Sequence, residues 1–370
     1  MKCLRTSIMA VMSIVFIAAS VHSAPAQESA NLPLAERGPY DVGRQRLTFA
    51  DADRDDRELL VGVWYPAIKP AELTVGAAKT GRNAGFLDAE PDLGAALYPL
   101  ILFSPWWSSN YQTDVALFVH LASHGFVVAS IDHQCDYEST CLVDRPLDML
   151  FVLDQLAGET ETTLAGTINP EQTGVMGISF GGYTTLVNAG ARVDPDYFLE
   201  WADDARLVSS NASDTYLFRT VVARWDEVAA YRAQFDVLQE HQPWPSISDE
   251  RIRAALAIVP GPGQLLGEHG LESITVPTLL LAGTLDEFAA YEQEIVPMYA
   301  QLNPENRYLI SFVGYGHHPE NTPDGAAYYR HFSTAFFGYF LQGQEDYADY
   351  LTEAYVDDFE DLVWGVVASE

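Results

Sequence analysis

Lysine is almost absent from this chain, and basic residues as a whole are scarce. Lysine and arginine together number 20, against 52 aspartate and glutamate residues, so the formal net charge is −32. The electrostatic field of such a negative charge repels the phosphates of nucleic acids and the headgroups of anionic membranes. The composition therefore argues against nucleic acid and anionic membrane surfaces as partners.

Long hydrophobic runs are also lacking after the first residues. The chain begins with the basic residues Lys2 and Arg5, which are followed by a short apolar stretch over residues 8–19. An Ala-x-Ala cleavage site then ends at Ala26. About 20 apolar residues are needed to span a bilayer, so this stretch is too short for a membrane anchor. The pattern is typical of a signal peptide over residues 1–26, and it predicts a secreted or periplasmic protein without stable membrane insertion.

Cysteine is scarce as well. After the predicted cleavage only Cys135 and Cys141 remain. An even number of cysteines in an exported protein favours a disulfide, which here would close a small ring after a strand end. The alternative is a pair of free buried thiols. No second Cys/His pair has the spacing of zinc ligands, so we expect no metal site.

The remaining chain shows the apolar patterns of both strands and helices, and hydrophobic residues account for 48% of the whole sequence. Short apolar runs alternate with amphipathic helical segments, which predicts one α/β domain over residues 27–370, with a mostly parallel sheet covered by helices on both faces. The expected strands cover residues 45–49, 59–65, 98–103, 126–131, 173–176, 254–259, 277–282 and 307–313. The expected helices cover residues 115–123, 146–156, 183–188, 289–302 and 326–341.

Residues 192–250 interrupt the alternation of strands and helices. They are rich in aspartate, arginine, tryptophan and tyrosine, with helical patches such as residues 220–238. We expect a helical, cap-like insertion that packs over the edge of the sheet. The acidic and aromatic segment from Gln344 indicates no particular role.

The central motif is Gly177-Ile178-Ser179-Phe180-Gly181-Gly182, a G-x-S-x-G pattern. A serine at a sharp turn between a strand and a helix tolerates no bulky neighbours, and the flanking glycines remove the Cβ atoms that would clash. The expected strand before the serine and helix after it supply the context that the motif requires. The pattern predicts a nucleophile at the N-terminus of a helix, which faces developing negative charge. The alternative is a tight structural turn with an idle serine.

A serine hydroxyl needs an adjacent base, oriented by an acid, before it attacks a carbonyl carbon. In this arrangement the acid and then the histidine follow the serine, each after a late strand. We predict Asp286 as the acid, with Glu287 as its competitor, and His317 as the base, with its neighbour His318 as the alternative. His133 also lies at a strand end but precedes the serine, and we expect it to orient a loop through hydrogen bonds.

A tetrahedral intermediate needs two main-chain N–H donors aimed at its oxyanion. We expect one from Phe180, directly after the serine, and the other from Trp107, in the loop after the strand at residues 98–103. The adjacent indoles of Trp106 and Trp107, with Tyr111 nearby, predict an apolar, aromatic-walled acyl pocket. Core packing is the alternative role for these indoles.

Five short motifs together resemble those of a known family. They are Gly38-Pro39-Tyr40-Asp41-Val42-Gly43, Val63-Trp64-Tyr65-Pro66-Ala67, Ile131-Asp132-His133, Arg145-Pro146-Leu147-Asp148 and Gly177-Ile178-Ser179-Phe180-Gly181-Gly182-Tyr183. Over nearly the whole mature chain, and more weakly across residues 192–250, the sequence resembles the bacterial predicted dienelactone hydrolases. These are similar to the platelet-activating-factor acetylhydrolases and, more distantly, to cutinase-like polyester hydrolases.

The resemblance implies an α/β-hydrolase fold, no cofactor, and hydrolysis of accessible small-molecule or lipid-like esters. The family's triad and oxyanion positions match Ser179, Asp286, His317, Trp107 and Phe180. Two features depart from the family pattern. Dienelactone hydrolases proper use a cysteine nucleophile where this chain has serine, and the oxyanion loop often carries His-Gly or Pro-Gly where this chain has Pro105-Trp106.

The sequence thus predicts a serine esterase that works through an acyl-enzyme on Ser179. One alternative is an amidase or peptidase that uses the same residues. The other is a non-catalytic homologue that only binds a ligand. The intact set of serine, acid and histidine argues against the non-catalytic alternative, because such proteins usually lack at least one of the three.

Overall fold

The computed structural model describes residues 32–71, 81, 84–94, 97–135, 140–158, 164–203 and 221–368. The predicted signal peptide, residues 1–26, lies outside the described residues, as does part of the predicted insertion, residues 204–220. Both of these expectations stay predictions.

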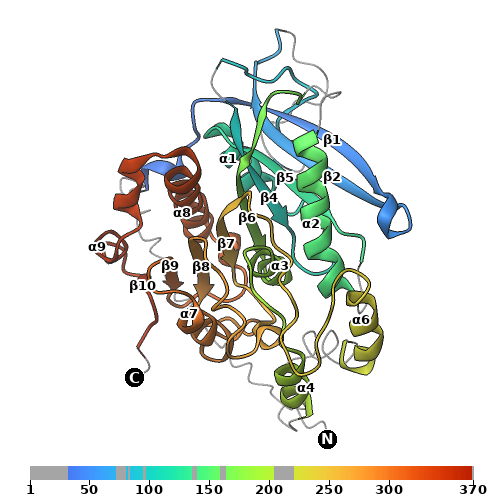
Figure 1. The fold of residues 1–370 in the computed structure, drawn as a ribbon. Helices are drawn as coiled ribbons and strands as arrows, with labels where there is room; N and C mark the ends of the chain where they lie inside the picture. The colour runs from blue at the N-terminus through green and yellow to red at the C-terminus, as the bar shows by residue number, and fades with distance from the viewer. Residues whose placement is uncertain are drawn as a thin grey trace, which may run out of the picture.

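One mixed sheet contains every strand of the described residues. The strands are β1 Asp41–Asp51, β2 Arg57–Ala67, β3 Phe86–Leu87, β4 Tyr98–Ser104, β5 Val127–Asp132, β6 Ile168–Ile178, β7 Ile252–Ile258, β8 Thr278–Gly283, β9 Arg307–Phe312 and β10 Leu362–Trp364. Their order across the sheet is β10-β9-β8-β7-β6-β4-β5-β2-β1-β3 (Figure 1). The strands β4, β5, β6, β7, β8 and β9 run parallel to one another. On one side of them β2 pairs antiparallel with β5, and on the other side β10 pairs antiparallel with β9. The predicted α/β class with a mostly parallel sheet is confirmed.

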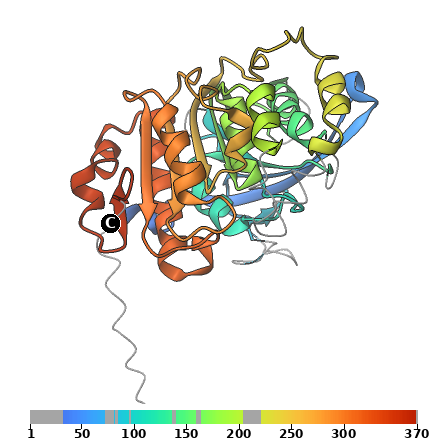
Figure 2. The same cartoon turned by 90° about the horizontal axis from the view of Figure 1, so that it is seen from below.

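Helices lie on both faces of the sheet (Figure 2). Their bounds are α1 Val115–Ser123, α2 Cys141–Gly158, α3 Phe180–Asn188, α4 Pro195–Asp203, α6 Trp225–Arg232, α7 Val296–Gln301, α8 Pro323–Gln342 and α9 Glu353–Val356. The α2, α3 and α7 helices cover one face, and α1 and α8 cover the other. Every residue of β4 and β8 is buried between these two layers, which explains why the central strands are continuous apolar runs.

The α2 helix begins earlier than its sequence pattern predicts. The apolar spacing predicts a helix from Pro146, but the helix begins at Cys141 and holds Pro146 in its interior. A proline there has no N–H for the carbonyl of Leu142, four residues before it. The hydroxyl of Tyr183 donates to that carbonyl at 3.1 Å, so a tertiary hydrogen bond replaces the missing helical one.

The described parts of segment 192–250 pack on the α2 and α3 side of the sheet. Phe198 of α4, Trp225 of α6 and Trp244 are buried in the same apolar cluster as the residues of α2 and α3. The hydroxyl of Tyr231 in α6 donates to Asp144 of α2 at 2.6 Å. The contacts of this segment with the domain are therefore both apolar and polar.

The segment after Gln344, to which the sequence assigns no role, completes one edge of the sheet. It contains β10, which pairs antiparallel with β9. Asp361, just before β10, accepts hydrogen bonds from the hydroxyls of Tyr315 (2.6 Å) and Tyr328 (2.7 Å). Tyr315 lies in the loop after β9, so the C-terminal segment supports that loop.

The packing of α8 on β6 can be tested at a glycine. A Cβ on Gly174 would lie 2.6 Å from the ring of Phe337 and 3.0 Å from Leu341. We expect Gly174→Ala to lower the free energy of unfolding by about 1–3 kcal/mol in urea denaturation, because the ring must shift. Gly158, the last residue of α2, has open space around its Cβ position and serves as the control. Gly158→Ala should leave stability unchanged or raise it by up to about 1 kcal/mol, and equal effects at both glycines would contradict this packing.

Candidate active site

Ser179 stands at the turn between β6 and α3 in a strained backbone conformation. Its φ of 57° and ψ of −118° lie in a region that residues with a side chain rarely adopt. Its N–H donates to the carbonyl of Ile258 at 2.9 Å, so the end of β7 holds the turn. A Cβ on Gly177 would lie 2.2 Å from the carbonyl oxygen of Gly181, and one on Gly181 would lie 1.9 Å from that of Ser104. Both flanking glycines of the motif are therefore sterically required.

The loops after β6, β8 and β9 bring Ser179, Asp286 and His317 together. Ser179 Oγ lies 2.9 Å from His317 Nε2, and His317 Nδ1 lies 2.7 Å from Asp286 Oδ2. His317 and Asp286 are buried, while Ser179 is partly exposed. Because the carboxylate accepts the Nδ1 proton, Nε2 is the nitrogen that presents a lone pair to the serine hydroxyl.

Main-chain amides hold the carboxylate of Asp286 in place. Its Oδ1 accepts from the N–H groups of Phe288 (2.8 Å) and Ala289 (2.9 Å). The N–H of Leu285 donates to the carbonyl of Tyr315 at 2.8 Å, which ties the aspartate loop to the histidine loop. Glu287, the competing acid, is an exposed side chain. The geometry favours Asp286.

The neighbouring histidine, His318, points toward a different carboxylate. Its Nδ1 lies 2.9 Å from Glu320 Oε1, and its ring packs edge-on against Trp106, with centroids 5.8 Å apart. The hydrogen bond that His318 donates to the carboxylate of Glu320 raises the pKa of His318. His317 Nε2 lies 2.9 Å from Ser179 Oγ, whereas His318 bonds to Glu320, so the geometry favours His317 as the base.

The two residues predicted as oxyanion donors lie in contact with each other. Phe180 is the first residue of α3, so its N–H has no partner within the helix. The ring of Trp107 packs edge-on against the ring of Phe180, with centroids 5.0 Å apart. The loop after β4 and the N-terminus of α3 therefore meet beside Ser179.

Trp106 and Tyr111, the residues predicted to line an acyl pocket, lie in different surroundings. Trp106 packs beside His318, next to the serine and its partners. Tyr111 packs over Gly62 and lines a cavity of about 430 Å³ together with Trp64 and Arg44. That cavity lies over β1 and β2, and its lining contains neither the serine nor its partners. The pocket role of Trp106 and Tyr111 stays a prediction.

Cys135 and Cys141 are within disulfide-bonding distance, with their Cα atoms 5.4 Å apart. Both side chains are buried. This separation is the one that the predicted disulfide requires. That disulfide joins the segment after β5 to the first residue of α2.

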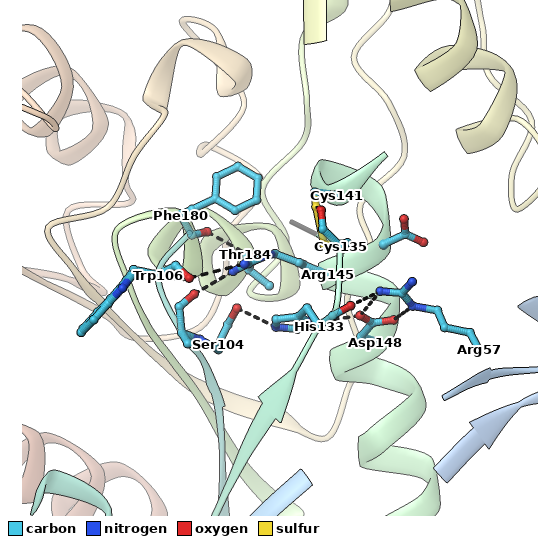
Figure 3. The surroundings of a disulfide bond; sticks show 12 residues. Arg57, Ser104, Trp106, His133, Cys135, Cys141, Arg145, Asp148, Phe180 and Thr184 are labelled. Carbon is cyan, nitrogen blue, oxygen red and sulfur yellow. Dashed lines mark hydrogen bonds and ion pairs between the residues drawn. A yellow bond between two sulfur atoms is a disulfide. The ribbon is translucent and has the colours of Figure 1, made fainter. Parts of the chain in front are cut away.

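His133, which follows β5, is fully buried and hydrogen-bonded at both nitrogens (Figure 3). Its Nδ1 lies 3.0 Å from Asp148 Oδ2 and its Nε2 lies 2.9 Å from Ser104 Oγ. Burial lowers the pKa of His133 to about 4, so the ring is neutral near pH 7. The expected hydrogen-bonding role of this histidine agrees with these contacts.

Two further residues, Phe288 and Arg145, contact the site, and the sequence assigns neither of them a role there. The ring of Phe288 packs against the imidazole of His317, with centroids 5.0 Å apart. Arg145 is buried, and its guanidinium donates to the carbonyl of Pro105 at 2.7 Å. The sequence signal for Arg145 was its place in the Arg-Pro-Leu-Asp motif. Its burial was not predicted, because most arginines lie at the surface and burial of this one depends on tertiary packing.

Two further features can be stated for the part of the chain that the structure describes. Within it, no group of three or more histidine, cysteine, aspartate and glutamate side chains is arranged to hold a metal ion. None of the helices in these ranges is both long enough and apolar enough to span a membrane.

Comparison with models of known protein families gives no match, and no curated protein matches the chain. The resemblance to the dienelactone hydrolases therefore stays a prediction from its motifs.

The buried, neutral state of His133 predicts an acid-sensitive contribution to stability. Between pH 6.5 and about 4 the unfolded chain binds a proton at His133 and the folded protein does not. The unfolded state therefore gains free energy of protonation, and stability falls as the pH falls through this window, by up to about 1.4 kcal/mol per pH unit.

His133→Gln removes the titrating imidazole, so the unfolded variant no longer binds a proton at this position. In urea denaturation, the stability difference between wild type and variant should shrink as the pH is lowered from 6.5 toward 4. A difference that stays constant with pH would show that His133 titrates normally in the folded protein.

Proposed function

We propose that the protein is a serine hydrolase that cleaves carboxylic esters through an acyl-enzyme on Ser179. The observation that carries this proposal is the hydrogen-bonded series from Ser179 Oγ to His317 (2.9 Å) and from His317 to Asp286 (2.7 Å). Nucleophilic catalysis by serine requires a hydroxyl within reach of an imidazole that a carboxylate orients.

The first chemical step is acyl transfer to the serine. Ser179 Oγ attacks the carbonyl carbon of the ester while His317 Nε2 takes the hydroxyl proton. The carbonyl oxygen becomes an oxyanion, and Asp286 stabilises the imidazolium. His317 then gives its proton to the leaving alcohol oxygen as the ester C–O bond breaks. Water repeats the sequence on the acyl-enzyme and releases the acid.

Stabilisation of the oxyanion is assigned to the N–H groups of Phe180 and Trp107. The N–H of Phe180 lies at the positive end of the α3 dipole, directly after the nucleophile. The contact between the rings of Phe180 and Trp107 supports a second donor from the loop after β4.

The proposed fold is that of the α/β hydrolases. Support comes from the chain order of serine, aspartate and histidine, which follow β6, β8 and β9 of the parallel sheet. The disulfide between Cys135 and Cys141 supports a place outside the cytoplasm.

Uncharged esters are the substrate class that the surroundings favour. The ring of Phe288 packs against His317, and the ring of Trp106 packs against the neighbouring His318. A net charge of −32 repels anionic substrates. The same atoms would also serve an amidase, so the leaving group is decided by experiment.

Replacing the nucleophile is the direct test of the proposal. Ser179→Ala should lower kcat for p-nitrophenyl acetate by on the order of 10⁴-fold or more, because no acyl-enzyme forms. A fluorophosphonate probe should label wild type at Ser179, as mapped by peptide mass spectrometry. Ser246→Ala, at an exposed serine, is the control and should keep full activity and labelling. A folded wild type that is neither labelled nor active would favour the ligand-binding alternative.

Adjacent histidines provide a matched pair for the base. His317→Ala should lower kcat by on the order of 10⁴-fold, because it removes the proton acceptor of Ser179. His318→Ala should change kcat by less than about tenfold, since that ring bonds to Glu320 instead. Steady-state kinetics of both variants at pH 8 gives the comparison. The reverse ranking would move the base to His318.

A further inference from the structure

A second array of serine, histidine and aspartate lies below the loop that carries Trp106 and Trp107 (Figure 3). Ser104 Oγ lies 2.9 Å from His133 Nε2, and His133 Nδ1 lies 3.0 Å from Asp148 Oδ2. All three side chains are 1% exposed or less, so no substrate reaches Ser104. The array therefore holds structure in place instead of reacting.

The direction of its hydrogen bonds fixes the end of β4. Asp148 accepts the Nδ1 proton of His133, so Nε2 accepts from the hydroxyl of Ser104. Asp148 also pairs with Arg54 (2.7 Å) and Arg57 (2.9 Å). Ser104, the last residue of β4, is thus tied through His133 to α2 and to the β1–β2 hairpin.

Arg145 reaches from α2 to the loop that follows Ser104. Its guanidinium donates to the main-chain carbonyls of Pro105 (2.7 Å) and Trp106 (3.4 Å). It also lies 5.0 Å from the ring centroid of Phe180 and 6.0 Å from that of Trp107. The guanidinium therefore contacts both residues whose N–H groups we assign to the oxyanion.

The contacts to the carbonyl of Trp106 also orient the N–H of Trp107, because both groups belong to one peptide. In the planar peptide between Trp106 and Trp107, the carbonyl and the N–H point to opposite sides. Arg145 and the N–H of Ser109 (3.2 Å) both donate to the carbonyl of Trp106. The N–H of Trp107 is then directed away from Arg145. A flip of this peptide would present a carbonyl oxygen in place of a donor.

We propose that Arg145 is a positioning residue that orients the Trp106–Trp107 peptide so that its N–H serves the oxyanion. This inference rests on the proposed esterase function. The array of Ser104, His133 and Asp148 fixes the start of the loop. The disulfide supports the same arrangement, because Cys141 begins the helix that carries Arg145 and Cys135 follows His133 closely.

The test replaces Arg145 and measures kcat and KM separately. Arg145→Met should lower kcat for p-nitrophenyl acetate by about 10- to 100-fold and change KM by less than about twofold, because the lost donor acts on the transition state. Arg145→Lys should fall between wild type and Arg145→Met, since an ammonium is a point charge that does not span two carbonyls.

Arg307 offers a matched control at the start of β9. Its guanidinium also donates to main-chain carbonyls, those of Tyr299 (3.1 Å) and Ala300 (3.2 Å), and it lies 4.5 Å from the ring centroid of Tyr299. Arg307→Met removes the same kinds of contact away from the loop after β4. It should leave kcat and KM as in wild type.

A trifluoromethyl ketone reports on the oxyanion directly, because it forms a tetrahedral adduct with the nucleophile. Across wild type and the Arg145 variants, its inhibition constant should rise by the same factor as kcat/KM falls. In the pH–rate profile, the limb that reports the pKa of the base should stay as in wild type, whereas a general disturbance of the site would shift it.

If Arg145→Met does not fold, Arg145→Lys and Ser104→Ala provide the test. Ser104→Ala should lower kcat by about three- to tenfold with KM retained, because it loosens only the start of the loop.

Two outcomes separate this inference from the proposed function. If wild type is active and the folded Arg145 variants keep the wild-type kcat, or differ from wild type only in a raised KM, the positioning role alone would be overturned. A wild type without ester hydrolysis or fluorophosphonate labelling would overturn the proposed function, and this inference with it.

Discussion

The close approach of main-chain segments around Ser179 constrains the rest of the molecule. The carbonyl oxygen of Ser104 lies 1.9 Å from where a Cβ on Gly181 would be, and the end of β7 bonds to the N–H of Ser179 at 2.9 Å. No side chain fits between these segments. The strands β4, β6 and β7 must therefore end together, and a parallel sheet packed by helices on both faces allows this.

Two arrays of serine, histidine and aspartate with the same hydrogen-bond logic occur within this one chain. They differ in exposure: Ser179 is partly exposed, while Ser104 is fully buried. We assign chemistry to the first and positioning to the second on that ground. Residue types alone do not separate the two, since each has an imidazole between a hydroxyl and a carboxylate.

Part of the small supply of positive charge lies inside the protein. Of 20 basic residues, Arg54, Arg57 and Arg145 have largely buried side chains around Asp148 and the loop after β4. Burial of a guanidinium is costly unless carboxylates or carbonyls receive its protons, and each of the three has such partners. In this strongly acidic chain, these three arginines therefore stabilise the interior beside the proposed site and do not offset the surface charge.

Local pattern determined the parts of this protein that depend on neighbours in the chain. The apolar periodicities predicted the parallel strands and the bounds of α1, and the glycines around Ser179 predicted the strained turn. The sequence favoured His317 over His318, and the tertiary structure brings the His317 ring to a serine 138 residues away. Tertiary structure alone decided that Arg145 is buried. It also decided the early start of α2 and the pairing of β10 with β9. In each case the deciding contact joins segments far apart in the sequence, and local periodicity carries no information about such contacts.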